Sequence, residues 1–235
     1  HTRTRRQRQM CIRDSTNLGV ANYDPISRSF FKMWEICRDL NIIDTENKNL
    51  VYGALAEGPG GFIECFNFYR RRYCVTPNDT VNCITLKPYN SDIPGWKKSN
   101  RIFKECSSYK ISYGKDDTGD LYKLENITYF SDLFRKNKAD LVTGDGGFEF
   151  SDDYSNQEIM AFQLIFCEAV TGLSILKIGG NMILKLFDLF HHCSLELIYI
   201  LCCYFSDVYI VKPFTSRSAN LSLIHISEPT RPGHI

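Results

Sequence analysis

The sequence predicts an α/β fold with a mostly parallel central sheet and helices on both faces. Short runs that are almost continuously apolar, such as residues 51–56, 81–86 and 140–144, are typical of buried strands. Segments with apolar residues at helical spacing lie between these runs. Fully apolar strands that alternate with helices are characteristic of parallel sheets covered on both sides. A length of 235 residues suits one domain of this kind.

Each element follows from the same two periodicities. The first helix is expected at 29–40, where Phe30, Trp34 and Ile36 recur at helical spacing. Further helices are expected at 60–72, 127–136, 156–173 and 195–205. Further strands are expected at 109–112, 181–187 and 207–211, with the segment 88–120 otherwise irregular because it is rich in Gly, Pro, Asn, Asp and Ser. In the helix at 156–173, one apolar face holds Ile159, Phe162, Gln163, Phe166 and Val170.

The two ends of the chain differ from the rest. Residues 1–15 contain five Arg and one Asp, and residues 221–235 break abruptly with the preceding pattern. Both resemble translated cloning sequence, so we expect 1–15 and 221–235 to be non-native, poorly ordered extensions of one domain at 16–220. The alternative for 1–15 is a natural basic arm that binds RNA. If residues 221–235 are non-native, the final edge strand of the sheet is expected to be missing.

Composition excludes several classes of protein. The net charge is +1, and it becomes −3 when both ends are set aside, so a nucleic-acid site must be a local basic patch. Ten Cys without a Cys-x-x-Cys pair indicate free thiols in an intracellular protein. The apolar run 195–205 is too short for a bilayer, so we expect no membrane span. The five His have no metal-ligand spacing, and we expect no metal.

A lysine lies inside a predicted buried strand. Lys185 is surrounded by apolar residues in the run 181–187. Burying an unpaired ammonium group costs several kcal/mol, so this side chain is expected to be paired or to give up its proton. Asp145 ends another predicted strand and is followed by two glycines. Ligands of parallel sheets bind at the carboxyl ends of the strands, so we expect both residues to line one crevice.

A glycine-rich turn follows the strand at 51–56. Gly58, Gly60 and Gly61 permit close backbone approach, and the next helix offers free N–H groups. The spacing is not Gly-x-Gly-x-x-Gly, and Lys87-Pro88 stands where a dinucleotide site has an acid. This pattern disfavours a nicotinamide dinucleotide and suits S-adenosylmethionine, whose sulfonium is cationic.

Seven segments in order then resemble the FtsJ-type ribose 2′-O-methyltransferases, and most closely their mRNA-cap branch. These segments are AEGPGGF (56–62), ITLKPYN (84–90), DTGDLYKLENI (117–127), DGGF (145–148), SNQE (155–158), LKLFDLF (184–190) and KPFTSRSAN (212–220). The resemblance runs from about Arg28 to Asn220. It implies a Rossmann-like S-adenosylmethionine-dependent methyltransferase fold.

The resemblance also implies a Lys-Asp-Lys-Glu catalytic site. Lys32, Asp145 and Lys185 match its first three members. The final Glu would follow Asn220, where this sequence has Leu221, so the fourth member is expected to be truncated. A neutral lysine can take the proton of a ribose hydroxyl, and Lys185 is expected to be this base, with Lys32 positioning the hydroxyl or stabilising the developing charge.

The remaining site residues come largely from the same resemblance. The expected cofactor-binding residues are Ala56, Glu57, Gly58, Pro59, Gly60, Gly61, Phe62, Gly119, Asp120 and Asp145. The expected RNA-binding residues are Arg28, Ser155, Asn156, Gln157 and Asn220. Trp96 or a nearby Tyr is a candidate for base stacking, and Lys97, Lys98, Arg101 and Lys104 are more simply a solvated face than a phosphate-binding rim.

The expected function is therefore methyl transfer from S-adenosylmethionine to a ribose 2′-hydroxyl of capped mRNA, at the first or second transcribed nucleotide. Two alternatives stay open, namely a ribosomal or transfer RNA substrate and a catalytically degenerate module that binds RNA or cofactor. We expect a monomer that works with the transcription or capping machinery, in the nucleus or cytoplasm, or in a viral factory if the source is viral.

Overall fold

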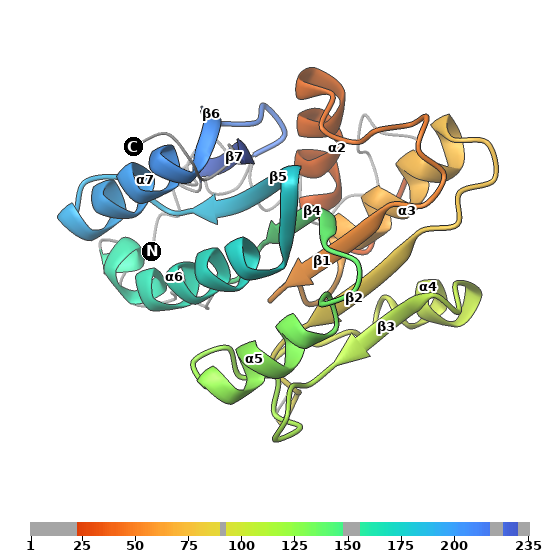
Figure 1. Cartoon of the computed structure of the whole chain (residues 1–235), viewed down its shortest axis with the longest axis horizontal. Coiled ribbons are helices and arrows are strands. Elements are labelled where there is room, and N and C mark those ends of the chain that lie inside the picture. The colour runs from red at the N-terminus through yellow and green to blue at the C-terminus, as the bar shows by residue number, and fades with distance from the viewer. Residues whose placement is uncertain (1–22, 90–92, 148–155, 217–222, 230–235) are drawn as a thin grey trace, which may run out of the picture.

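The computed structural model describes residues 23–89, 93–147, 156–216 and 223–229. Within these residues, seven strands form one sheet in the order β3-β2-β1-β4-β5-β7-β6 (Figure 1). Their bounds are Val51–Leu55 (β1), Thr80–Ile84 (β2), Tyr109–Ser112 (β3), Ala139–Gly144 (β4), Leu176–Leu186 (β5), Phe205–Val211 (β6) and Leu223–Pro229 (β7). Strands β1 to β5 pair in parallel, which confirms the predicted parallel sheet.

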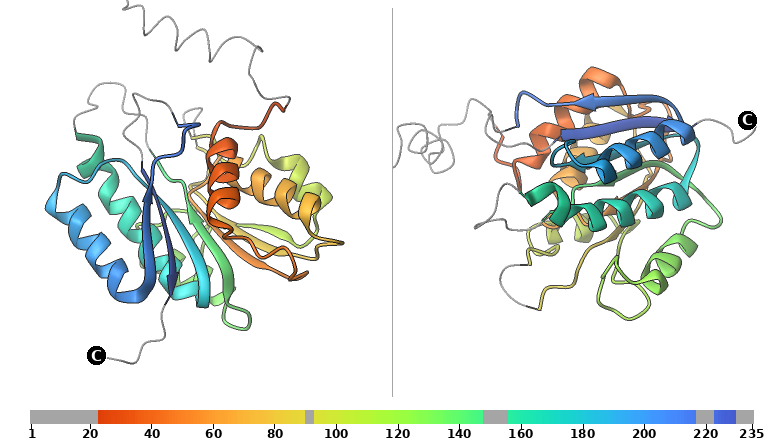
Figure 2. Two further views of the ribbon diagram at one scale, coloured as in Figure 1. Left: turned by 90° about the horizontal axis from the view of Figure 1, so that it is seen from above. Right: turned by 90° about the vertical axis from the view of Figure 1, so that its left-hand side faces the viewer.

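Helices cover both faces of the sheet (Figure 2). Those on one face are α2 (Ser29–Leu40), α3 (Gly61–Tyr73) and α4 (Asn100–Glu105). Those on the other are α5 (Leu124–Asp132), α6 (Gln157–Ile175) and α7 (His192–Tyr204). Each face has its own apolar core, and strand residues supply alternate side chains to the two cores, such as Tyr52 to one and Leu55 to the other.

Most predicted elements are confirmed within a few residues, and two of the differences concern helices. The short helix α4 was not predicted, because Ser, Asn and Lys around it gave no apolar periodicity. In α6 the predicted apolar face was wrong as a packing face, since Ile159, Phe166 and Val170 are exposed. The buried face instead carries small residues such as Ala161 and Ala169, which let the helix lie close to β4 and β5.

The final strand is present, contrary to our expectation. β7 runs antiparallel to both β5 and β6, with Lys185 opposite Ile224 and Tyr209 opposite Ile226. It is therefore an interior strand, and β6 forms the edge. The physical reason is that the gap between β5 and β6 leaves unpaired backbone donors and acceptors on both strands. The stretch Leu223–Ile226, rich in β-branched residues, has the propensity to fill this gap.

A buried ion pair ties helix α3 to the start of β2. The guanidinium of Arg70 donates to both carboxylate oxygens of Asp79, at 2.7 and 2.8 Å, and both side chains are only 1% exposed. Arg70 also donates to the carbonyl oxygens of Asp44 and Asn47, and Asp79 accepts from the N–H of Leu50. The Arg70–Asp79 pair thus holds the connection between α2 and β1 against helix α3 and the start of β2.

Candidate active site

The carboxyl ends of β4 and β5 bring Asp145 and Lys185 together, as predicted. The Lys185 amine lies 3.2 Å from Asp145 Oδ1 and donates to the Asp145 carbonyl oxygen at 2.9 Å. The two side chains are 13% and 14% exposed. This contact explains how the strand tolerates a charge among apolar residues, since the carboxylate offsets the cost of burying the amine.

Lys32 faces the same two residues from helix α2. Burial lowers the pKa of Lys32, and the nearby cations Lys185, Lys212 and Arg28 lower this pKa further, whereas Asp145 raises it. The three residues predicted to be catalytic therefore share one electrostatic environment at the edge of the sheet. An amine with a lowered pKa is the kind of group that can accept a proton near neutral pH.

Glu57 reaches this cluster from the loop after β1. Its carboxylate accepts from the hydroxyl groups of Tyr52 and Thr143 beneath the turn, and it is 2% exposed. Burial raises the pKa of Glu57 well above its ordinary value, and the negative charge of Asp145 raises it further. Glu57 is thus a buried acid on the α2/α3 side of Asp145.

A second buried acid, Glu168, was not predicted. It extends from α6 on the opposite face of the sheet, and its Oε1 accepts from the N–H of Gly146 at 3.0 Å. A Cβ on Gly146 would lie 2.4 Å from this oxygen, so the glycine allows the carboxyl to reach the backbone. Glu168 thereby holds the turn that presents Asp145. The available signal was an acid inside the apolar run 164–170, the same kind of signal that singled out Lys185.

The charge state of Glu168 predicts a pH effect on stability. Burial raises the pKa of Glu168 to about 8 from an ordinary value of 4.5. Its contribution to stability is therefore complete below pH 4.5 and is lost as the pH rises through about 8. We expect Glu168→Gln, a neutral isostere, to gain thermal stability relative to the parent protein between pH 5 and pH 9. Melting temperatures of both proteins across this range measure the effect.

The control for this prediction is Glu168→Ala. Alanine leaves the Gly146 N–H without its acceptor and opens a cavity, so it should lower the melting temperature at every pH. A difference between the Gln variant and the parent protein that stays constant from pH 5 to pH 9 would show that Glu168 does not titrate there.

The glycine turn packs against neighbouring protein segments. Gly60 has φ +102°, a left-handed conformation that favours glycine. A Cβ there would lie 2.1 Å from Ser99 Oγ, and a Cβ on Gly58 would lie 2.9 Å from the Gly95 carbonyl oxygen. We predicted from the sequence that these glycines permit backbone approach to a ligand. The structure shows that these glycines also let the segment 95–99 close over the turn.

The predicted RNA-binding residues have mixed positions. Ser155 and Asn220 lie outside the described residues. Asn156 is exposed at the start of α6, but Gln157 beside it is buried. Arg28 precedes α2 and contributes to the electrostatic environment of Lys32. These placements bring Arg28, but not Gln157, to a position open to a ligand.

The prediction that Trp96 stacks on a base was wrong. Its ring is 4% exposed and packs edge-on against Phe103 in the core. The side chains of Lys97, Lys98, Arg101 and Lys104 are exposed around α4, and Arg101 pairs with Glu105 at 2.7 Å. This arrangement agrees with a solvated face.

Comparison with known proteins decides the family. The sequence matches the family described as FtsJ-like methyltransferase over residues 25–226, most of the chain. The chain belongs to the FtsJ-like methyltransferase family. The match extends past residue 220 into the segment that forms β7.

Several relatives of this chain are named as cap-modifying proteins. It is 35% identical to mouse cap-specific mRNA (nucleoside-2′-O-)-methyltransferase 2 over 71% of this chain and 22% of the relative. It is 34% identical to the zebrafish protein of the same name over 87% of this chain and 28% of the relative. It is 32% identical to zebrafish cap-specific mRNA (nucleoside-2′-O-)-methyltransferase 1, over 81% and 23%. The chain thus spans about a quarter of the length of these relatives.

Solved structures show the methyltransferase fold. A putative ribosomal RNA methyltransferase from Plasmodium falciparum has a TM-score of 0.57 at 13% identity, covering 86% of this chain and 97% of that chain. A putative class I S-adenosylmethionine-dependent methyltransferase from Listeria monocytogenes has a TM-score of 0.55 at 12% identity, covering 98% and 68%. The fold is therefore the Rossmann-like methyltransferase fold that the sequence predicted.

The methyl donor of this fold, S-adenosylmethionine, fits the residues present. Asp145 Oδ1 is buried and accepts no hydrogen bond, although it pairs with Lys185, so one acceptor is available for a cationic group. The first turn of α3 offers backbone N–H groups to a carboxylate. Gly119 has φ +70°, and a Cβ there would lie 1.9 Å from the Thr85 carbonyl oxygen, so this glycine lets the loop bearing Asp120 lie close to β2. All three features follow the carboxyl ends of strands, Asp145 after β4, the first turn of α3 after β1 and the Gly119 loop after β3.

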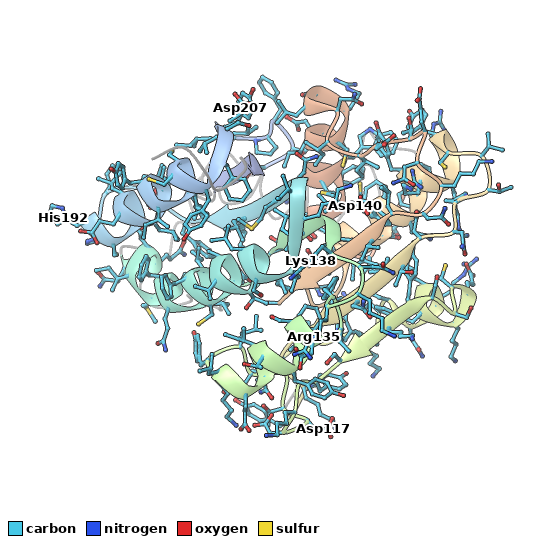
Figure 3. The ribbon with its side chains drawn as sticks, in the orientation of Figure 1. Asp117, Arg135, Lys138, Asp140, His192 and Asp207 are labelled. Carbon is cyan, nitrogen blue, oxygen red and sulfur yellow. The ribbon has the colours of Figure 1, made fainter. Side chains whose placement is uncertain are left out.

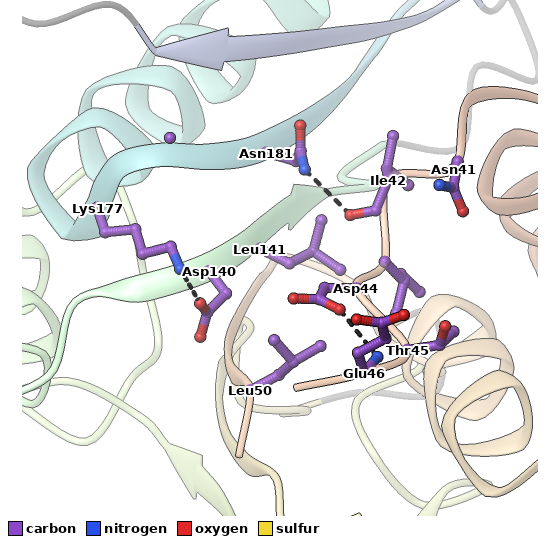
Figure 4. Close-up of a pocket in the computed structure, with 12 residues that line it drawn as sticks. Asn41, Ile42, Asp44, Thr45, Glu46, Leu50, Asp140, Leu141, Lys177 and Asn181 are labelled. Atoms are coloured by element: carbon purple, nitrogen blue, oxygen red, sulfur yellow. Dashed lines mark hydrogen bonds and ion pairs between the residues drawn. The ribbon is translucent and has the colours of Figure 1, made fainter. Parts of the chain in front are cut away.

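One cavity of about 350 Å³ lies away from this site, at the amino-terminal ends of β4 and β5 (Figure 4). Its lining includes the ion pair between Lys177 and Asp140, and Asn181 donates to the Ile42 carbonyl oxygen at 3.0 Å. Figure 3 places Asp140 and Lys138 at this start of β4. The cavity is therefore separate from Asp145 and Lys185.

Within the described ranges, no group of three or more His, Cys, Asp or Glu side chains is arranged to hold a metal ion. Helix α6 is long and apolar enough to cross a membrane by length and composition. It packs on β4 and β5 through residues such as Ile165, which is typical of a core helix.

Proposed function

We propose that this chain transfers a methyl group from S-adenosylmethionine to a ribose 2′-hydroxyl of capped mRNA, at the first or second transcribed nucleotide. The observation that carries the proposal is the Lys185–Asp145 contact with Lys32 nearby, at the edge of the sheet that also bears the glycine turn. The names of the relatives support the choice of capped mRNA. Such an enzyme acts in the nucleus or the cytoplasm, where capped transcripts occur.

The proposed chemistry assigns a separate task to each side chain. A ribose hydroxyl is a poor nucleophile until its proton is removed, and a lysine amine in the neutral form can accept this proton. When bound, S-adenosylmethionine would supply an activated methyl group, and its sulfonium would become a neutral thioether. Asp145 holds the Lys185 amine in place and balances its charge after proton transfer. Alignment of the hydroxyl with the methyl group supplies much of the remaining acceleration.

We propose Lys185 as the base and Lys32 as the residue that positions the hydroxyl. Lys185 is fixed by two contacts with Asp145, which orient its amine. The lowered pKa of Lys32 supports the reverse assignment, because burial has already weakened its hold on a proton. The two assignments differ in their predicted pH dependence.

Activity should rise with pH as the base loses its proton and then level off. If Lys185 is the base, Lys32→Met should keep this rise in its residual activity. In Lys185→Met the rise should disappear. Single-turnover rates of both variants between pH 6 and pH 10 measure this. A rise that persists in Lys185→Met and disappears in Lys32→Met would assign the base to Lys32.

RNA binding is proposed for residues around this centre. Arg28 lies within electrostatic range of Lys32, and its guanidinium suits a phosphate group. Asn156 is exposed and lies a short way after Asp145 in the sequence. Ser155 and Asn220 remain proposals on the family resemblance alone, whereas the burial of Gln157 argues against a contact with RNA.

The test of the proposed function is transfer of labelled methyl groups to short RNAs of one sequence. We expect transfer to RNA with a 7-methylguanosine cap and much less to the same RNA with a 5′ triphosphate or hydroxyl. Equal transfer to capped and uncapped RNA would support a ribosomal or transfer RNA substrate. Cofactor binding without transfer to any RNA would support a degenerate binding module.

A further inference from the structure

Two phenylalanine side chains at the carboxyl edge of the sheet are almost fully exposed. Phe190 follows β5 and is 84% exposed, and Phe214 follows β6 and is 98% exposed. Strands β5 and β6 run in the same direction, because each pairs antiparallel with β7. The two loops therefore leave the sheet at the same edge as Asp145. We call Phe190 and Phe214 the aromatic rim.

The backbone of each rim residue is fixed by a carboxylate. The N–H of Phe214 donates to Glu35 at 2.6 Å, and Thr215 adds bonds from its N–H and hydroxyl at 3.1 and 3.0 Å. The N–H groups of Phe190 and His191 donate to Glu158 at 3.1 and 3.0 Å. Charge-assisted bonds of this kind are stronger than neutral ones. The exposed rings are thus presented by anchored loops.

The anchor of Phe214 also sets its position relative to Lys32. Glu35 lies three residues after Lys32 on helix α2, so both side chains are on neighbouring positions of one helix face. Lys212, two residues before Phe214, contributes to lowering the pKa of Lys32, so its charge lies within electrostatic range of that amine. Asp188 interacts with Lys212 from the loop after β5. The loop after β6 is therefore tied to the helix that carries a predicted catalytic residue.

This combination matches the chemistry of single-stranded RNA. Exposed aromatic rings stack on unpaired nucleobases whatever their sequence, and nearby cations contact the phosphates between them. Arg28 and Lys212 both lie within electrostatic range of Lys32, and Lys212 is two residues before Phe214, so positive charge lies on the Phe214 side of the rim. An aromatic ring that is nearly fully exposed has no packing role within the described protein, which distinguishes it from the buried Trp96.

We propose that Phe190 and Phe214 are base-stacking residues that bind unpaired nucleobases of the RNA strand flanking the methylated ribose. The inference rests on the proposed function for the identity of the strand. It adds a subsite that holds the RNA in line with Lys32 and Lys185.

The experiment uses the full chain and short capped RNAs with 2-aminopurine at one position next to the 5′ nucleotide. The fluorescence of 2-aminopurine falls when the base stacks on an aromatic ring. We expect quenching with the parent protein and with Phe214→Trp. We expect less quenching, and RNA affinity lower by about 5- to 100-fold, with Phe214→Ala and with Phe190→Ala. Phe214→Leu should behave like the alanine variant, since leucine is apolar but cannot stack.

The matched control is Tyr199→Ala, which removes a 71% exposed aromatic ring from α7 and should leave RNA affinity unchanged. Parental affinity in the Phe190 and Phe214 alanine variants, or full affinity with Phe214→Leu, would overturn the proposal. Methyl transfer is measured on the same samples. If quenching depends on Phe190 and Phe214 but no methyl transfer occurs, the rim is upheld and the proposed function is rejected. Methyl transfer with an unchanged KM for RNA in both alanine variants would uphold the proposed function and reject the rim.

Discussion

Replacing Lys185 by methionine is expected to lower the rate of methyl transfer to capped RNA by about 10²- to 10⁴-fold. Methionine has a similar length and is apolar, so strand β5 should keep its packing between β4 and β7. The variant lacks the amine that lies 3.2 Å from Asp145 Oδ1, and with it the proposed proton acceptor. Rates at saturating substrate, together with calorimetry of S-adenosylmethionine binding, separate loss of chemistry from loss of cofactor.

Lys177→Met is the matched control for this substitution. Lys177 lies near the amino-terminal end of the same strand, where it pairs with Asp140 beside the separate cavity in Figure 4. We expect this variant to retain parental activity. A Lys185→Met protein that binds cofactor and methylates RNA at the parental rate would remove Lys185 from the reaction.

The second large effect is expected on stability. Asp79→Ala leaves the guanidinium of Arg70 buried without its carboxylate, which typically costs about 3–5 kcal/mol. It also removes the acceptor of the Leu50 N–H. The free energy of unfolding, measured by urea titration, should fall by this amount. Asp79→Asn keeps an acceptor for the Leu50 N–H but loses the charge, so its free energy of unfolding should fall less.

The neighbouring residue provides a control for the ion pair at Asp79. Arg71 pairs with Glu105 at 3.5 Å, and both side chains are largely exposed. Glu105→Ala should therefore lower the free energy of unfolding far less than Asp79→Ala does. If Asp79→Ala were as mild as Glu105→Ala, the buried pair would not secure the connection between α3 and β2.

Much of the fold could be predicted because its signals are local. The strands carry continuous apolar runs, and the helix at Ser29–Leu40 has a clear period. The strand β7 could not be predicted in the same way, because its place depends on the gap between β5 and β6, which belongs to the assembled sheet. The packing face of α6 was wrong because small residues, such as Ala161, carry less apolar signal than Phe166 although they permit closer approach.

The candidate site shows the same division. Lys185 and Asp145 were predictable, because a charge in an apolar strand and an acid at a strand end are visible in the sequence. The role of Lys32 required the family resemblance, since Lys32 lies among ordinary helix residues. Glu168 and Phe214 acquire meaning only from their surroundings, namely the Gly146 N–H and the Glu35 carboxylate, which are distant in sequence.

The central claim is that Lys32, Asp145 and Lys185 act on a ribose hydroxyl, and the position of the transferred methyl group tests it most directly. Capped RNA is methylated with labelled S-adenosylmethionine and then hydrolysed with alkali. We predict that the label stays in an alkali-resistant dinucleotide containing the first or second nucleotide, and that a 2′-deoxy sugar at that nucleotide abolishes labelling. Label on a nucleobase, or undiminished labelling of the 2′-deoxy RNA, would contradict the claim.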